Sequence, residues 1–342
     1  MIEVAGLTKQ FGRTRAVDDL SFTVSPGAVT GFLGPNGAGK TTTMRMIVGL
    51  DRPTAGSALI KGRAYKDLKN PLREVGTLLD ARSVHPKRTA RNHLRWVAAT
   101  NGIPATRVDE VLGLVGLADV ANKPAGGFSL GMGQRLGIAQ ALLGDPHTLI
   151  LDEPVNGLDP EGIHWVRTLL QRLAREGRSV LVSSHLLSEM AQTADRLVVI
   201  GQGRLVADAT TEDFIRASSR SAVVVRSPRI AELADVFARA GIQISQATDG
   251  SGRPQLIAAD VETDAVGDLA FRAGIPLSEL SERHGSLEEA FMHITENSVQ
   301  FASNRPAGEN ATALPGGPGR PAPRVPQEPQ DQTRAKHRKD QR

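Results

Sequence analysis

Residues 34–42 read GPNGAGKTT and fit the glycine-rich phosphate-binding pattern G-x-x-x-x-G-K-[ST]. In this pattern, backbone N–H groups at the start of a helix surround phosphate oxygens, and glycines let the main chain approach the anion closely. Lys40 would bring its charge to the outer phosphates, and the Thr41 hydroxyl is placed to hold Mg²⁺. We call these residues the phosphate loop and expect all of them to bind the ligand: Gly34, Pro35, Asn36, Gly37, Ala38, Gly39, Lys40, Thr41 and Thr42.

The flanking residues supply the elements that this pattern requires. Residues 28–33 form a short apolar run typical of a buried strand, and residues 42–50 carry apolar residues at helical spacing. The sequence therefore predicts strand, loop and helix in that order, with a nucleotide phosphate as the ligand.

Two acidic residues follow a second apolar run. The string LILDEP spans residues 149–154 and places Asp152 and Glu153 at the carboxyl end of a predicted buried strand, where open α/β sheets bind their ligands. We expect Asp152 to hold Mg²⁺, directly or through water, and Glu153 to polarise an attacking water as general base. Together with the phosphate loop, this pair predicts nucleotide hydrolysis.

The pattern around these motifs predicts an α/β fold. From residue 2 to about 209, short β-branched strands alternate with helical stretches, which favours a largely parallel sheet. Residues 148–151, 179–182 and 197–200 are the clearest buried strands. Between about 82 and 144 helical periodicity replaces the strands, most clearly at 90–99 and 108–115, so we expect a helical insert there.

A second unit is predicted from residue 221 to 296. Its elements follow the order strand, helix, hairpin, helix, strand, which is the split βαβ arrangement of an α+β module. The expected strands are 222–225, 242–246, 255–258 and 276–280, and the expected helices are 229–240 and 263–273. Residues 286–289 match a capping box that opens a final helix to about 295. The module lacks convergent catalytic residues, so we interpret it as regulatory or dimerising.

Composition limits the remaining possibilities. The net charge of +4 comes from the tail 303–342, which holds eight Lys or Arg and four Asp or Glu, whereas the rest of the chain holds 33 residues of each sign. The tail is basic, rich in Pro and Gly and poor in large apolar residues, so we expect it to be disordered, and we expect no nucleic-acid partner. The chain has no cysteine and no apolar run long enough to span a bilayer. Residues 1–6 lack the charged start and apolar core of a signal peptide, so we expect none.

The ordered motifs resemble the nucleotide-binding subunit of an ATP-binding cassette (ABC) transporter over residues 1 to about 215. The string FSLGMGQR at 128–135, which we call the signature, resembles the family's signature as found in antibiotic-exporting and multidrug-exporting members. The resemblance implies that Ser129 and Gly131 contact the γ-phosphate held by the other subunit of a dimer. It also implies that Asp159 in NGLD (156–159) belongs to an inter-subunit loop.

Three further residues take their expected roles from this resemblance. His185, at the end of SSH (183–185), matches the switch histidine at the γ-phosphate, and Phe11 resembles the aromatic residue that stacks on adenine. Stacking tolerates any base, so GTP stays open beside ATP. Asp80 occupies the place of the family's usual glutamine, and as a carboxylate it is a candidate Mg²⁺ ligand and catalytic group.

The resemblance implies a complete working assembly. We expect ATP with Mg²⁺ to close a homodimer, or a heterodimer with a related subunit, on the cytoplasmic face of the membrane. A separately encoded multi-span permease would convert closure and hydrolysis into export of a drug, antibiotic or lipid-like substrate. The alternative is a soluble ABC ATPase that acts on ribosomes or DNA, but this chain has neither a second cassette nor a long coiled coil. A GTPase switch is disfavoured because NKPA at 122–125 lacks the base-reading aspartate.

Overall fold

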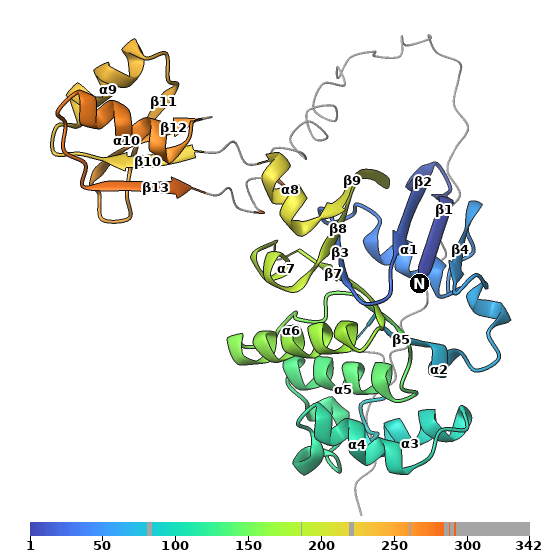
Figure 1. Cartoon of the computed structure of the whole chain (residues 1–342). Coiled ribbons are helices and arrows are strands. Elements are labelled where there is room, and N and C mark those ends of the chain that lie inside the picture. The colour runs from blue at the N-terminus through green and yellow to red at the C-terminus, as the bar shows by residue number, and fades with distance from the viewer. Residues whose placement is uncertain are drawn as a thin grey trace, which may run out of the picture. The chain divides into compact units, whose positions relative to one another are not determined.

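The computed structural model describes residues 1–80, 84–185, 187–218, 222–259 and 261–283, together with Leu287 and Phe291 (Figure 1). A six-stranded sheet forms the core of the first 215 residues, which we call the cassette. In sheet order its strands are β5 (Val75–Leu78), β6 (Thr148–Leu151), β7 (Ser179–Ser184), β3 (Val29–Leu33), β8 (Arg196–Gly201) and β9 (Arg204–Thr210). Neighbouring strands are parallel except β8 and β9, which are antiparallel. The predicted α/β core with a largely parallel sheet is confirmed.

The two faces of this sheet are buried in two apolar clusters. Alternate residues of a strand point to opposite faces, so Leu149 and Leu151 of β6 enter one cluster and Ile150 enters the other. Strands β3, β6 and β7 are buried along their whole length, as expected for strands covered on both sides. Outside the helical insert, the helices between cassette strands are α1 (Lys40–Ile47), α2 (Pro71–Glu74), α6 (Pro160–Arg175) and α7 (Leu187–Thr193), and α8 (Thr211–Ser218) follows β9.

A separate antiparallel sheet was not anticipated from the sequence. Its order is β2 (Thr14–Val24), β1 (Ile2–Phe11) and β4 (Ala55–Ile60). The inward residues of β2 pack into the same cluster as Met44 and Ile47 of α1, and the ring of Phe22 stacks on that of Phe32 at 5.3 Å between centroids. This sheet therefore supports the helix that begins at the phosphate loop.

The helical insert has the predicted form. Its helices α3 (Ala90–Thr100), α4 (Thr106–Leu114) and α5 (Leu130–Leu142) gather at one end of the cassette (Figure 1). Short 3₁₀ turns occupy Tyr65–Asp67, Ala118–Val120 and Ala125–Gly127. The signature opens α5 as predicted, and α5 also packs against β5, so the insert is joined to the parallel sheet through this helix.

The second unit has the split βαβ order. It runs β10 (Ala222–Arg226), α9 (Ile230–Arg239), β11 (Ile244–Thr248), β12 (Pro254–Ala259), α10 (Thr263–Arg272) and β13 (Glu279–Arg283). Its antiparallel sheet has the order β11-β12-β10-β13, and Phe237 is fully buried between sheet and helices. The predicted α+β module is confirmed, but the last strand lies at 279–283 instead of 276–280. Pairing with β10 begins at Glu279, and Pro276 has no N–H to donate to a ladder.

The remaining expectations for the C-terminus fall largely outside the described residues. These are the capping box at 286–289, apart from Leu287, and the tail 303–342. Leu287 is buried, and both it and Phe291 join the apolar cluster that holds α5 and α6. In the part of the chain that the structure describes, no helix has the length and apolar character needed to cross a membrane.

Candidate functional site

The phosphate loop joins the end of β3 to the start of α1, and its shape depends on glycine. Gly39 has φ of 103°, which favours glycine, and a Cβ there would lie 2.5 Å from the carbonyl oxygen of Ala16. A Cβ on Gly34 would lie equally close, at 2.5 Å from the carbonyl oxygen of Ile200. No side chain caps α1, so the N–H groups of its first turn face the loop and are suited to binding an anion.

Lys40 is a nearly buried cation in this loop. Its side chain folds back, and Nζ donates to the carbonyl oxygens of Gly34 at 2.6 Å and Pro35 at 3.4 Å. Burial lowers the pKa of Lys40, and the nearby carboxylates of Glu153 and Asp152 oppose that shift. The loop therefore holds a positive charge close to the backbone groups that would surround a phosphate.

Asp152 meets the phosphate loop across the sheet. The Thr41 hydroxyl donates to Asp152 Oδ2 at 2.5 Å, and the Ser183 hydroxyl donates to the other carboxylate oxygen. These contacts arise because β6, β7 and β3 are neighbours in the parallel sheet, so their carboxyl ends meet at one edge. Ser183 also accepts from the N–H of Glu153 at 2.9 Å. Ser183 was not predicted as a site residue, although it lies in the SSH string that ends at His185.

Glu153 and His185 form a second contact at the same edge. His185 Nδ1 lies 2.8 Å from Glu153 Oε2, so the imidazole holds the orientation of the carboxylate. The backbone of Glu153 has φ of 50°, a left-handed conformation that is uncommon for a residue with a side chain. The chain therefore turns sharply after Asp152 and directs the two acids of LILDEP to different partners.

Lys40, Thr41, Asp152 and Glu153 line one pocket of about 250 Å³. Thr41 and Asp152 offer it a hydroxyl and a carboxylate, the oxygen donors that Mg²⁺ prefers. Among the described residues no group of three or more His, Asp or Glu could hold a metal alone. The pocket is lined by Ala16, Asn36, Gly37, Ala38, Gly39, Lys40, Thr41, Thr42, Asp152 and Glu153.

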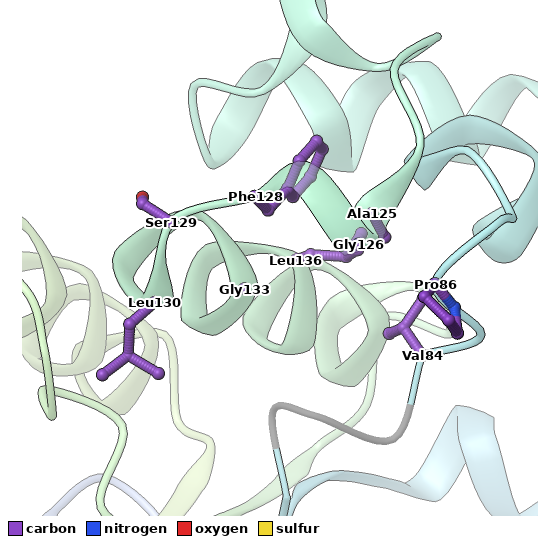
Figure 2. Close-up of a pocket in the computed structure, with 9 residues that line it drawn as sticks. All are labelled: Val84, Pro86, Ala125, Gly126, Phe128, Ser129, Leu130, Gly133 and Leu136. Atoms are coloured by element: carbon purple, nitrogen blue, oxygen red, sulfur yellow. The ribbon is translucent and has the colours of Figure 1, made fainter.

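The signature lines a different pocket. Ser129 caps α5 by accepting from the N–H of Met132 at 3.2 Å, and its side chain is exposed at the helix start. Figure 2 shows Ser129 and Leu130 at the end of this pocket opposite Val84 and Pro86. Its volume is about 450 Å³, and it is lined by Val84, Pro86, Ala125, Gly126, Phe128, Ser129, Leu130, Gly133 and Leu136.

The remaining predicted residues also stand apart from the phosphate pocket. Asp159 caps α6 by accepting from the N–H of Gly162 at 2.9 Å, and like Ser129 it is exposed. Phe11 is 51% exposed at the end of β1, with Lys9 Nζ 4.9 Å from its ring centre. Asp80 is exposed two residues beyond β5, and β5 pairs with β6, the strand that Asp152 follows. One chain therefore brings the phosphate loop, Asp152, Glu153 and His185 together, but not the signature.

Different family models match the cassette and the second unit. A family model described as ABC transporter matches residues 17–156, and one described as a domain of unknown function (DUF8746) matches residues 221–288. Among solved structures, an ATP-binding subunit of an ABC transporter is 29% identical with a TM-score of 0.58 and covers 64% of this chain and 92% of that one.

Of three curated relatives, one matches over more residues than the cassette contains. The bacitracin transport ATP-binding protein BcrA of Bacillus licheniformis is 46% identical over 209 residues, 60% of this chain and 68% of the relative. The lantibiotic transport ATP-binding protein SrtF of Streptococcus pyogenes is 35% identical over 206 residues, 60% of this chain and 89% of the relative. The ABC transporter ATP-binding protein YcbN of Bacillus subtilis (strain 168) is 34% identical over 304 residues, 87% of this chain and 98% of the relative. The chain therefore belongs to the ABC transporter family, as an ATP-hydrolysing subunit of its exporter branch.

Proposed function

We propose that two subunits enclose each ATP between the phosphate loop of one and the signature of the other. The observation that carries this proposal is the convergence of Lys40, Thr41, Asp152 and Glu153 in one pocket, while Ser129 is exposed in another. A helix N-terminus attracts anions, and the start of α5 is free to meet a phosphate on a facing subunit. A homodimer and a heterodimer of related subunits both satisfy this arrangement.

The residues of the pocket and those around it have separable tasks in hydrolysis. Glu153 accepts the proton of the attacking water, and His185 keeps that carboxylate in place through its Nδ1 contact. Lys40 and the N–H groups of the first turn of α1 stabilise the negative charge on the phosphate oxygens. Mg²⁺ held by Thr41 and Asp152 would neutralise charge that develops there. Phe11 would hold the base by stacking, which suits ATP without excluding GTP.

Asp80 is proposed as an additional oxygen ligand or water-orienting group at the same edge of the sheet. We expect Asp80→Asn to raise the Mg²⁺ concentration that supports half-maximal ATP turnover by about tenfold, because the amide binds a hard cation more weakly. Turnover at graded Mg²⁺ and fixed ATP measures this shift. Asp67→Asn, at the 3₁₀ turn before α2, is the control. An unchanged Mg²⁺ dependence in the Asp80 variant would remove Asp80 from the metal site.

The substrate class and the partner are proposed from the relatives. Two of them are named for the transport of bacitracin and of a lantibiotic, and both of these compounds are peptide antibiotics. We propose that this subunit drives export of a peptide of that kind. A separate permease would hold the subunit at the cytoplasmic face of the membrane, since no described helix is suited to span it.

Loss of this subunit should make its host more sensitive to exported peptides. We expect deletion of the gene to lower the inhibitory concentration of bacitracin or a lantibiotic at least fourfold, or about two doubling dilutions, because accumulation depends on the pump's ATP turnover. Wild-type copies should restore resistance and Glu153→Gln copies should not. An antibiotic of unrelated chemistry serves as control. Equal sensitivity of deleted and intact strains to all peptides tested would argue against this substrate class.

A further inference from the structure

One face of α5 lies against the residues that follow β6. Leu130 and Gln134 are four positions apart and therefore share a face of this helix. The segment that they meet runs from Glu153 to Asp159, and we call it the base loop. It carries the proposed general base at one end and the proposed inter-subunit aspartate at the other.

Gln134 contacts the backbone of the base itself. Its Nε2 donates to the carbonyl oxygen of Glu153 at 3.3 Å, and its side chain is only 7% exposed. On the other side of the same residue, Ser183 accepts from the Glu153 N–H. A left-handed backbone at a residue with a side chain persists where its surroundings fix it. Gln134 and Ser183 supply two such restraints.

Leu130 fills the space above Gly157 in the base loop. A Cβ on Gly157 would lie 2.5 Å from Leu130 Cγ. The leucine side chain therefore occupies the space that a side chain at position 157 would need. A Cβ on the neighbouring Gly131 would lie 3.2 Å from the carbonyl oxygen of Gly157 and 3.2 Å from a methyl of Leu158. The first turn of α5 is therefore in close steric contact with the base loop.

These contacts join two parts of one subunit that serve different ATP molecules in the proposed dimer. We propose that Leu130 and Gln134 are positioning residues that tie each signature helix to the Glu153 of its own subunit. The inference rests on the proposed function, in which that signature serves one ATP and that Glu153 acts on the other. When the start of α5 engages the partner's nucleotide, the base loop of the same subunit moves with it. The two ATP sites are coupled through α5.

Mixed dimers separate this coupling from a local effect on the signature. One subunit carries Lys40→Ala and the other carries Gln134→Met, which keeps the side-chain length and removes the donor. The single working site then combines the phosphate loop and Glu153 of the Gln134→Met subunit with the intact signature of its partner. The altered α5 faces the disabled site.

We expect the working site to turn over about tenfold more slowly than in the same mixed dimer with Gln134 intact, with unchanged ATP affinity and thermal melting. Gln140→Met, on the same helix but paired with His93, is the matched control. Equal turnover with and without Gln134 would overturn the proposal. Glu153→Gln in the working subunit must abolish turnover, and if it does not, the proposed function fails instead.

A double-mutant cycle in the homodimer tests the contact between Leu130 and Gly157. It does not require dimers with a single working site. Gly157→Ala should lower turnover about tenfold or more, because its methyl collides with Leu130. Adding Leu130→Gly should recover part of that loss. Gly177→Ala controls for backbone strain, because Gly177 has φ of 89° and no atom near its Cβ position. Additive effects of the two changes would contradict coupling through this contact.

Discussion

A Glu153→Gln subunit should bind ATP like the wild type and hydrolyse it at least about 100-fold more slowly. General bases contribute factors of this size, and the amide cannot accept the proton of the attacking water. The phosphate cradle is unaffected, because Lys40 and Thr41 make their contacts without the Glu153 side chain. The variant should therefore accumulate as an ATP-bound dimer. Steady-state phosphate release, ATP titration and light scattering measure the three properties.

The comparison requires a control that changes a glutamate elsewhere. Glu212→Gln alters an exposed carboxylate in the first turn of α8 and should leave turnover at the wild-type level. Turnover of the Glu153 variant within about twofold of wild type would exclude Glu153 as the base, since a lost general base costs far more. In that outcome His185, which contacts the same carboxylate, would be the next residue to test.

The parts of the site that the sequence predicted are those carried by short segments. The phosphate loop and LILDEP each combine a strand end with polar residues a few positions later, so their placement at one sheet edge follows from parallel pairing. The predicted helices at 90–99 and 108–115 are found at 90–100 and 106–114, because apolar residues recur at helical spacing there.

The parts that were missed depend on contacts between distant residues. The antiparallel sheet pairs β1 with the distant strand β4, from Ile2 with Ile60 to Thr8 with Ala55, and the pairing includes a register shift, which local alternation does not reveal. Ser183 becomes a site residue only because β7 lies beside β6. The contact of Leu130 with Gly157 similarly joins the start of α5 to the base loop, two segments that are distant in the sequence.

Mixing two inactive subunits should restore ATP hydrolysis if the sites are shared between chains. Ser129→Arg disables the signature by placing a bulky cation at the start of α5, and Lys40→Ala removes the buried cation of the phosphate loop. Each homodimer has two defective sites. A mixed dimer has one site with both defects and one in which an intact phosphate loop faces an intact signature.

We therefore expect mixtures to exceed either parent at least about tenfold in turnover, because one complete site regains the full set of charge contacts. Titrating one inactive subunit against the other should give a maximum near equal amounts, where mixed dimers are most abundant.

A mixture of Lys40→Ala subunits with Glu153→Gln subunits is the control. Lys40 and Glu153 line the same pocket of a subunit, so in this mixed dimer the site with an intact phosphate loop still lacks its base. Recovery in the first mixture and none in the second would place Ser129 at the partner's ATP. No recovery in either, with mixed dimers confirmed by light scattering and tag capture, would contradict independent catalysis at a site shared between chains. It would also make the contact between α5 and the base loop the leading explanation for a requirement that both sites be intact.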